Sequence, residues 1–269
     1  MKTRARHTLA SDPLSLVFAA LGGMVLLFLI APLAGMAFNS PLSDLADTAA
    51  EKEVRASILL TLWTALAATT ICSVAAVPFA WVLARKQFPL KRLVSGIIDL
   101  PVVVPHSAAG IAILGFIAPN SCIGGTAERA GIQFVGGAAG IIVAMAFVSV
   151  PFLINAARDG FAAAPERLEK AALTLGASPA RVFFTISLPL AWRAIVSGMV
   201  MMWARGMSEF GAVAIVAYHP IVASVLIYER FGAFGLAHAR PVAVLFLGVC
   251  LVFFIVVRLL AREDTHAPR

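Results

Sequence analysis

Residues 168–179 read Leu-Glu-Lys-Ala-Ala-Leu-Thr-Leu-Gly-Ala-Ser-Pro, and residues 186–189 read Ile-Ser-Leu-Pro. This polar, helix-forming stretch interrupts a chain that is otherwise strongly apolar, with 61% hydrophobic and 13% charged residues. Such a balance lies far outside that of a soluble domain. The sequence therefore indicates a membrane protein, and the polar stretch is a candidate contact site for another polypeptide.

Six apolar segments are long enough to cross a membrane as helices, since a span needs about 20 residues. They are 14–38, 56–84, 93–118, 136–156, 188–216 and 241–260. Backbone amides in lipid must be hydrogen-bonded within the segment, and the sequence lacks the alternation typical of a membrane barrel. We therefore predict an all-α polytopic membrane protein with one domain over residues 1–269. The first segment is too long for a cleavable signal peptide, so we expect it to remain as a span.

The distribution of positive charge predicts the orientation of these spans. With a cytoplasmic N-terminus, 15 of the 21 Lys and Arg residues fall on the inside and 5 on the outside, and Arg205 lies within the fifth span. Cytoplasmic loops carry such an excess. We expect both termini and the loop 158–187, between spans four and five, to lie on the cytoplasmic side of a plasma (inner) membrane. The orientation of the spans and contacts with anionic lipid then explain the net charge of +7, so we expect no nucleic-acid partner.

The first half of this loop is expected to form a short helix from Pro165 to Leu175. Glu166 and Lys170 form an i,i+4 pair on one face, while apolar residues at helical spacing form a stripe on another. The stripe consists of Leu168, Ala171, Ala172 and Leu175. Gly176 is expected to end the helix as a left-handed cap.

A second short helix is expected to begin with Ser178 as N-cap and Pro179 in the first turn. Leu188-Pro189 would then open the fifth span. Two short amphipathic helices bent at a glycine would therefore protrude from the membrane. The alternative is an ordinary interfacial loop that lies on the bilayer.

The run from Glu169 to Pro189 resembles the coupling loop of ABC importer permeases, whose pattern is Glu-Ala-Ala-x-x-x-Gly followed by Ile-x-Leu-Pro. In that family the two short helices sit in a groove of the ATPase subunit and transmit its closure to the membrane helices. Lys170 stands where the pattern has its Glu, and Glu169 lies one residue earlier, which puts a salt bridge from that Glu in doubt. The resemblance implies a set of coupling residues: Glu169, Lys170, Ala171, Ala172, Gly176, Ser178, Pro179 and Pro189.

Absent motifs narrow the function further. The sequence contains no Gly-Lys-Ser or Gly-Lys-Thr to hold ATP phosphates, so ATP hydrolysis is expected on a separate subunit. It also lacks the nucleophile and metalloprotease motifs, and its three cysteines show no paired spacing. We therefore expect a transport subunit rather than an enzyme, with no cofactor and no metal site.

Arg205 and Glu209 are four residues apart on the predicted fifth span and therefore share one helix face. A charge at mid-bilayer costs about 2.5–3.5 kcal/mol, so the pair is either a structural ion pair or part of a pathway. Residues 208–212 are similar to the Gly-Glu-Phe-Gly-Ala segment of the sulfate, molybdate and tungstate permeases, with Ser208 in place of the first Gly. In that group this span lines the route between two permease subunits near the outer gate.

The predicted third span contains Leu100-Pro101 and Pro105-His106, which are similar to the Leu-Pro-x-x-x-Pro-His segment of molybdate/tungstate permeases. Two prolines four residues apart remove two helix hydrogen bonds and predict a kink or break. For His106 we favour a packed, hydrogen-bonded role over direct substrate contact. The resemblance implies a set of pathway or gate residues: Pro101, Pro105, His106, Arg205, Ser208, Glu209 and Phe210.

These resemblances imply the permease subunit of an ATP-driven ABC importer for a tetrahedral oxyanion, molybdate or tungstate. The implied partners are a second permease subunit in a homodimer, two ATPase subunits, an external binding protein and membrane lipid. Force would reach the chain with Gly176 as pivot and Leu188-Pro189 as the joint to the fifth span. Sulfate or thiosulfate is the nearest alternative substrate. A membrane-embedded enzyme and a passive channel are more distant alternatives.

Overall fold

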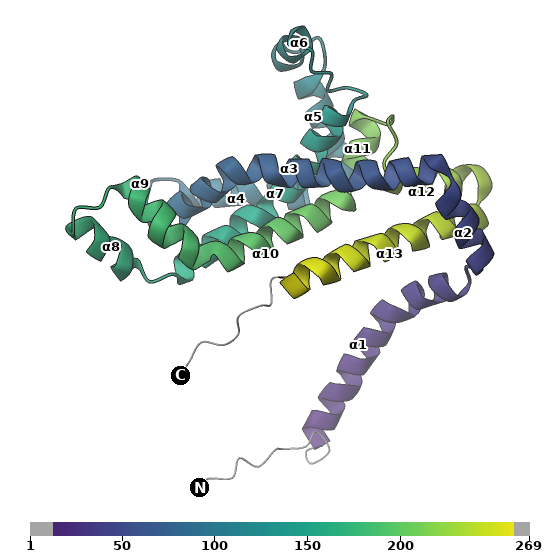
Figure 1. Ribbon diagram of the computed structural model, residues 1–269, viewed down its shortest axis with the longest axis horizontal. Helices are drawn as coiled ribbons and strands as arrows, with labels where there is room; N and C mark the ends of the chain where they lie inside the picture. The colour runs from purple at the N-terminus through teal and green to yellow at the C-terminus, as the bar shows by residue number, and fades with distance from the viewer. Residues whose placement is uncertain (1–12, 261–269) are drawn as a thin grey trace.

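The computed structural model describes residues 13–260, and every regular element within them is a helix (Figure 1). In chain order the elements are α1 (Pro13–Phe38), α2 (Leu42–Ala50), α3 (Lys52–Arg85), α4 (Lys91–Val103), α5 (His106–Ile117), α6 (Cys122–Arg129), α7 (Ala138–Ala163), α8 (Glu166–Thr174), α9 (Pro179–Val182), the π-helical turn η2 (Phe183–Ser187), α10 (Leu188–Met207), α11 (Gly211–Val216), α12 (Ala223–Phe234) and α13 (Leu236–Leu260). The prediction of an all-α fold is confirmed.

Five helical segments within residues 13–260 are long and apolar enough to cross a membrane. They are α1, α3, α7, the continuous run Pro179–Met207 and α13. The remaining predicted span, the third along the chain, is the pair α4 and α5, which is bent by 111° between the two helices. The expected spans are therefore all present as helices, and the third is broken. Five of the Lys and Arg residues that were counted on the inside lie outside the described residues: Lys2, Arg4, Arg6, Arg262 and Arg269.

The bundle of α3, α7 and α10 forms the centre of the molecule, and α7 makes the most extensive contacts with α10 and α3. Glycines allow the backbones of α7 and α10 to approach closely. A Cβ on Gly160 would lie 2.4 Å from the Cβ of Ala194, and one on Gly198 would lie 2.8 Å from the Cβ of Ala156. Small residues at such contacts are the usual means of packing helices in membranes, where burial from water gives no driving force.

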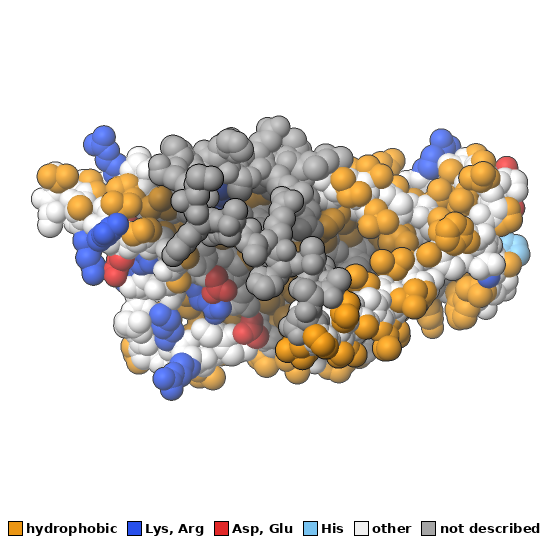
Figure 2. All heavy atoms as spheres, turned by 90° about the horizontal axis from the view of Figure 1, so that it is seen from below, with side chains coloured by type: hydrophobic (Ala, Val, Ile, Leu, Met, Phe, Trp, Pro, Cys, Tyr) orange, Lys and Arg blue, Asp and Glu red, His pale blue; other side chains and the backbone are white. Residues whose placement is uncertain are grey.

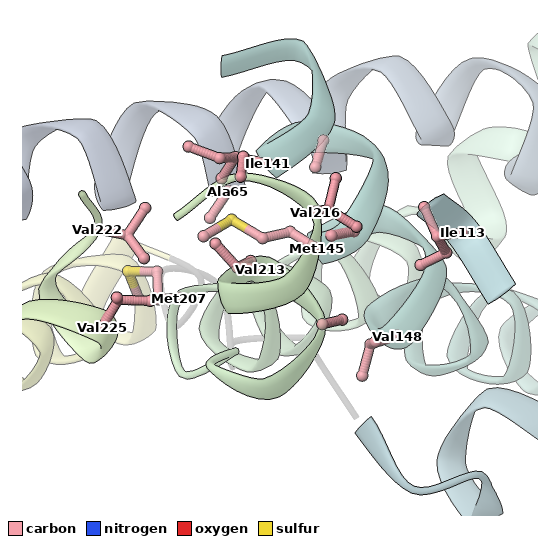
Figure 3. Close-up of a cluster of buried hydrophobic side chains, with 14 of the residues drawn as sticks. Ala65, Ile113, Ile141, Met145, Val148, Met207, Val213, Val216, Val222 and Val225 are labelled. Carbon is pink, nitrogen blue, oxygen red and sulfur yellow. The ribbon is translucent and has the colours of Figure 1, made fainter. Parts of the chain in front are cut away.

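A core of buried side chains joins this bundle to α5, α11 and α12 (Figure 3). Met145 of α7 lies at its centre, with Ile113 from α5 and Val213 from α11 packed around it. A second cluster nearer to α8 contains Leu83, Phe161 and other side chains of α3, α7 and α10. The short helices α5 and α11 are therefore anchored on the spanning helices and fix the positions of the polar residues at their ends.

The fifth span differs from the prediction, because the helix does not continue to Val216. α10 ends at Met207, and α11 begins at Gly211. The side chain of Ser208 donates to the Arg205 carbonyl, and a carboxylate oxygen of Glu209 accepts the backbone N–H of Ala212. Both bonds satisfy backbone groups that a helix terminus leaves open, so they stabilise the break.

Helix α1 stands apart from the bundle (Figure 1), and none of its residues is buried. Among residues 13–260, its most extensive contact with another helix is with α13. A helix that is apolar all round and uncovered by its own chain faces lipid or another protein chain. On the face drawn in Figure 2, Lys and Arg side chains gather mainly at the end that carries α8 and α9, and hydrophobic side chains cover much of the remainder.

The opposite end of the molecule, near α2 and α12, contains an ion-pair cluster. Arg230 of α12 pairs with Glu51 and, at 3.3 Å, with Glu53. The Arg230 guanidinium lowers the pKa of Glu51 through hydrogen bonding, and the same bonds raise the pKa of Arg230. The pairs connect α12 to the start of α3.

The pair of Glu51 with Arg230 predicts a small acid-sensitive contribution to stability. The pKa of Glu51 is lower in the folded chain, so its contribution is present at neutral pH, declines below about pH 4.3 and disappears below the folded pKa. Because Glu51 is largely exposed, we expect Glu51→Gln to lower the free energy of unfolding by less than about 1 kcal/mol at pH 7. Thermal unfolding in detergent at pH 7 and pH 4 measures this. If the difference in unfolding midpoint between Glu51→Gln and the unaltered protein is larger at pH 4 than at pH 7, the assignment is contradicted.

Candidate functional site

The polar stretch forms helix α8, which ends in the predicted glycine cap. The φ angle of Gly176 is +88°, in the left-handed region. Its N–H donates to the carbonyl of Leu173 at 3.0 Å, and the N–H of Ala177 donates to the carbonyl of Ala172 at 3.0 Å. This pair of bonds is the Schellman motif. The helix begins at Glu166, one residue later than predicted, because Pro165 is its N-cap rather than its first residue.

The second helix begins as predicted, since the side chain of Ser178 accepts the N–H of Arg181 at 3.3 Å and Pro179 occupies the first turn. Helix α10 begins at Leu188 with Pro189 in its first turn, as predicted. α9, the π-helical turn η2 and α10 form one continuous helical run. Pro189 has no N–H, and its ring would clash with the carbonyl four residues earlier in an α-helix. The wider π turn directly before it avoids that clash and keeps the helix unbroken.

Glu169 forms a salt bridge with Arg85 of the same chain rather than with another polypeptide. Its side chain is buried, and its carboxylate accepts two hydrogen bonds from Nε of Arg85, at 3.1 and 3.0 Å, and one from Nη2 at 2.9 Å. The hydroxyl of Ser187 donates to the same carboxylate at 2.9 Å. The neighbouring Lys170 is exposed and pairs with Glu166 at 3.3 Å, as the spacing predicts. Sequence reasoning missed Arg85, which lies 84 positions away.

The predicted apolar stripe of α8 faces outward. Leu168 is 44% exposed and Leu175 is 88% exposed. Ala171 is exposed and Ala172 is half-buried. The short helix thus buries a carboxylate and presents alanine and leucine side chains to its surroundings. Among the described residues nothing covers this surface, which fits a contact with another polypeptide better than the interior of a folded loop.

The two prolines of the third span break it, as predicted. Pro101 lies within α4 and is buried, while Pro105 is the N-cap of α5. Val104, between the two helices, is extended, with φ −66° and ψ 132°. A residue that precedes proline is sterically disfavoured in the α conformation, which explains the break at this point. The 111° bend makes His106 the first residue of α5.

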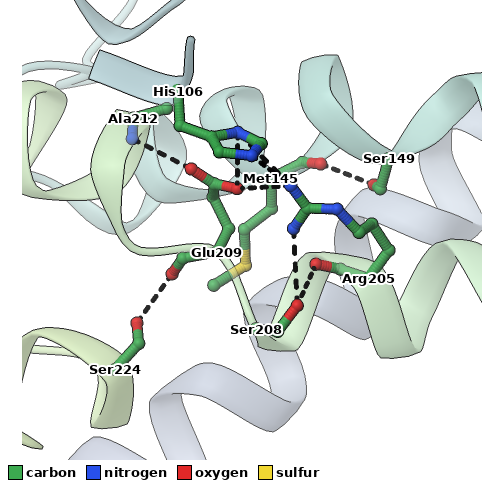
Figure 4. A network of polar contacts seen from close by, with 8 residues as sticks. All are labelled: His106, Met145, Ser149, Arg205, Ser208, Glu209, Ala212 and Ser224. Atoms are coloured by element: carbon green, nitrogen blue, oxygen red, sulfur yellow. Dashed lines mark hydrogen bonds and ion pairs between the residues drawn. The ribbon is translucent and has the colours of Figure 1, made fainter. Parts of the chain in front are cut away.

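The bend brings His106 to Arg205 and Glu209, so residues predicted from two separate spans form one cluster (Figure 4). Nη2 of Arg205 lies 3.1 Å from Oε2 of Glu209 and 3.0 Å from Nε2 of His106. Nδ1 of His106 lies 3.3 Å from the same Oε2. Glu209 is 1% exposed, whereas the side chains of Arg205 and His106 are 23% and 44% exposed. The carboxylate is therefore fixed, and the two basic groups reach the open side.

Neighbouring residues hold this cluster in place. Nη1 of Arg205 lies 3.4 Å from the Ser208 hydroxyl. The Ser224 hydroxyl donates to the Glu209 carbonyl at 2.6 Å. The ring of Phe210 packs at a tilt of 44° against the ring of Tyr228, with centroids 4.7 Å apart. Ser224 and Tyr228 come from α12, and sequence reasoning missed their part in the cluster because they lie well downstream of Glu209.

Gly211 explains how α5 and α11 can approach at the cluster. A Cβ at this position would lie 2.8 Å from the Cβ of His106. On the facing helix, a Cβ on Gly110 would lie 2.9 Å from the Cα of Ala212. Gly211 and Ala212, the small residues of the segment 208–212, therefore permit close helix packing. They allow the bent third span to contact the broken fifth span.

A known family matches most of this chain. The family described as binding-protein-dependent transport system inner membrane component matches residues 76–263. The chain belongs to this family. The match includes α8, η2 and the cluster of His106, Arg205 and Glu209, so both candidate sites lie within the family's shared region.

Curated members of this family are similar over nearly their whole length. The molybdate/tungstate transport system permease protein WtpB of Pyrococcus abyssi is 43% identical over 90% of this chain and 93% of its own. The same-named protein of Thermococcus kodakarensis is 43% identical over 92% and 96%. A probable sulfate transport system permease protein cysT of Chlorokybus atmophyticus is 34% identical over 91% and 87%.

Solved ABC transporters share the fold of this permease. A bacterial alginate ABC transporter, crystallised with its alginate pentasaccharide-bound periplasmic protein, superposes with a TM-score of 0.72 over 94% of this chain and 96% of that chain, at 16% identity. The inward-facing methionine transporter MetNI superposes with a TM-score of 0.61 over 80% and 97%, at 19% identity. The chain is therefore an ABC importer permease by family and fold, a transport subunit rather than an enzyme.

Proposed function

We propose that this permease forms the membrane passage for a tetrahedral oxyanion, molybdate or tungstate, in an ATP-driven importer. The observation that carries the proposal is the 43% identity to molybdate/tungstate permeases over nine-tenths of the chain. The sulfate permease at 34% identity keeps sulfate or thiosulfate as the second candidate, because these are also tetrahedral dianions. An external binding protein delivers the oxyanion and supplies most of the selectivity, since a passage that binds tightly would trap its substrate.

The cluster of His106, Arg205 and Glu209 is the proposed point of passage. The guanidinium of Arg205 is partly exposed, so it provides a favourable potential for a dianion. Glu209 neutralises part of that potential and thereby keeps binding weak. Pro101 and Pro105 act through the bend of the third span rather than through contacts with the ion, and Ser208 and Phe210 help to hold the cluster in place.

The loop 158–187 is the proposed contact with the ATPase subunit. Its support is the exposed apolar stripe of α8, which includes Ala171, Ala172 and Leu175. Small side chains permit close docking into a groove, and Gly176 with Ser178 and Pro179 sets the angle between the two helices. Force then passes along the continuous helix from α9 through η2 and Pro189 to α10.

The proposed assembly contains two copies of the permease and two ATPase subunits in a plasma (inner) membrane. The uncovered apolar surface of α1 supports contacts beyond the single chain. The proposed topology places both termini in the cytoplasm. Its support is the distribution of Lys and Arg, which places 15 of the 21 on the inside in this orientation. The mass of the detergent-solubilised complex measures the stoichiometry, and two different permease chains in it would contradict the homodimer.

Uptake by the assembled complex tests the proposed substrate. The permease is purified with its ATPase and binding protein and reconstituted into lipid vesicles, and accumulation of molybdate, tungstate and sulfate is measured with and without ATP. We expect ATP-dependent accumulation of molybdate and tungstate, each competing with the other, and little accumulation of sulfate. Preferential sulfate uptake would assign the permease to the second candidate. Ion conductance by the permease alone would make it a channel.

Gly176→Val is expected to uncouple ATP hydrolysis from transport. A left-handed conformation costs an L-residue about 1–2 kcal/mol, and a β-branched side chain more, so the turn between α8 and α9 must rearrange. We expect the ATPase to dissociate from the complex, or substrate-stimulated ATP hydrolysis to fall severalfold. Gly176→Asn is the matched control, because asparagine tolerates this conformation and should retain most activity. Normal substrate-stimulated hydrolysis by the valine variant would refute the proposed role of the loop.

A further inference from the structure

The buried carboxylate of Glu169 is unusual among the residues of α8, because the rest of the helix is largely exposed. The side chains of Arg85 and Glu169 are only 8% and 7% exposed. All four described hydrogen bonds to the carboxylate come from outside α8. A buried charge held in this way is costly to form and tolerates little displacement, because losing one partner leaves the other charge unpaired.

The partners of Glu169 come from different parts of the membrane domain. Arg85 is the last residue of α3, and Ser187 is the last residue of η2, directly before α10. The guanidinium of Arg85 also donates to the carbonyl of Ala164, at the junction of α7 and α8, at 3.0 Å. One ion pair therefore ties α8 to the adjoining ends of three spanning helices, α3, α7 and α10.

Aromatic packing strengthens the same junction. Phe183 of η2 packs edge-on against Trp81 of α3, with ring centroids 5.9 Å apart, and lies 6.1 Å from the ring of Phe161 of α7. The polar and the aromatic contacts thus connect the same three segments, namely α3, α7 and η2. By contrast, the backbone that leads from α8 to α9 is the exposed turn around Gly176, where a Cβ would have no neighbour within 4 Å.

We propose that Arg85, Glu169 and Ser187 form a clamp that makes α8 and the ends of α3 and α10 move as one body. This proposal rests on the proposed contact of α8 with an ATPase subunit. Without the clamp, a push on α8 would be absorbed by the flexible turn at Gly176. With it, the push reaches the second and fifth spans together, so Arg85 and Glu169 are positioning residues for the transport step.

The first test measures transport per ATP hydrolysed in the assembled, reconstituted complex. Glu169→Gln keeps the size of the side chain and its bond from Ser187 but removes the charge. Arg85→Lys keeps the charge but removes the two-pronged guanidinium contact. We expect both variants to bind the ATPase and hydrolyse ATP while molybdate transported per ATP falls about tenfold, a typical size for coupling between two sites. The exchanged pair R85E/E169R should recover part of the loss.

Glu51→Gln is the matched control, because it removes a carboxylate from another arginine pair at the opposite end of the molecule. It should leave transport per ATP unchanged. Unaltered coupling in both Glu169→Gln and Arg85→Lys would overturn the clamp. A parallel loss of hydrolysis and transport would also overturn it, because that result indicates a role in folding or docking alone.

A second test needs no ATPase and separates the clamp from the proposed function. A spin label is attached at the exposed position of Leu173 on α8, by Leu173→Cys in a chain whose three native cysteines are replaced by alanine. We expect the label to become more mobile in Glu169→Gln and to remain unchanged in Glu51→Gln. Unchanged mobility in Glu169→Gln would refute the clamp whatever the complex transports. Increased mobility with no ATP-dependent uptake by the unaltered complex would retain the clamp and refute the proposed function.

Discussion

Gly160→Leu is expected to disrupt the packing of α7 against α10 and to lower the stability of the folded permease strongly. The Cβ of any residue at this position would lie 2.4 Å from the Cβ of Ala194, and the Ala191 carbonyl lies behind it at 3.4 Å. Neither group is the end of a flexible side chain, so the helix backbones must separate. Overpacking of this kind costs about 3 kcal/mol, a large part of the stability of a typical protein.

The measurement is the fraction of protein that elutes as a single species in detergent, together with its thermal unfolding midpoint. Gly248→Leu is the matched control, because Gly248 lies inside α13 with nothing within 4 Å of an added Cβ. Leucine is the better helix former at both positions by about 0.8 kcal/mol, so propensity alone would stabilise both variants. Equal midpoints for the two variants would show that the close contact of α7 and α10 carries no stability.

Arg205→Ala is expected to reduce oxyanion uptake at least about tenfold while the complex still assembles. The variant removes a charge that is partly open to the passage and leaves Glu209, which is 1% exposed, with His106 and the N–H of Ala212 as partners. The potential at the cluster then changes from balanced to negative, which opposes a dianion. ATP-dependent molybdate uptake and recovery of the complete complex are the two measurements.

The loss of Arg205 has a structural effect that must be separated from the loss of its potential. A buried carboxylate that loses its arginine partner is destabilised by up to about 3 kcal/mol, so the single variant is expected to unfold at a lower temperature. The double variant Arg205→Ala with Glu209→Gln removes both charges and should recover that stability. Uptake should stay low in the double variant if Arg205 attracts the oxyanion. Recovered uptake would show that the pair is structural, as would unchanged uptake in the single variant.

Local patterns predicted much of the fold and of both candidate sites. The spans follow from apolar length, the cap at Gly176 from a glycine after an amphipathic helix, and the bend before His106 from two prolines. In each case the cause lies within a few residues of the effect. The backbone has little choice there, because side-chain sterics and unpaired amide groups restrict it directly.

The differences from the prediction arise from local backbone and side-chain bonding that apolar length does not reveal. The fifth span was expected to run to Val216, but the side chains of Ser208 and Glu209 bond to backbone groups and end α10 at Met207. The π turn η2 directly before α10, which makes Pro179–Met207 one continuous run, was not predicted from the sequence. Hydrophobicity alone does not distinguish an unbroken apolar helix from one that is interrupted at a polar residue.

The polar stretch 168–189 shows most clearly what each level of structure decides. The sequence by itself determined that two short helices meet at Gly176 and that an apolar stripe runs along the first, because spacing and cap geometry are local properties. Only the tertiary structure decided that Glu169 is buried against Arg85 and that the stripe faces outward. The physical reason is that a helix has two faces, and the face that is buried depends on the partners that distant segments bring to it.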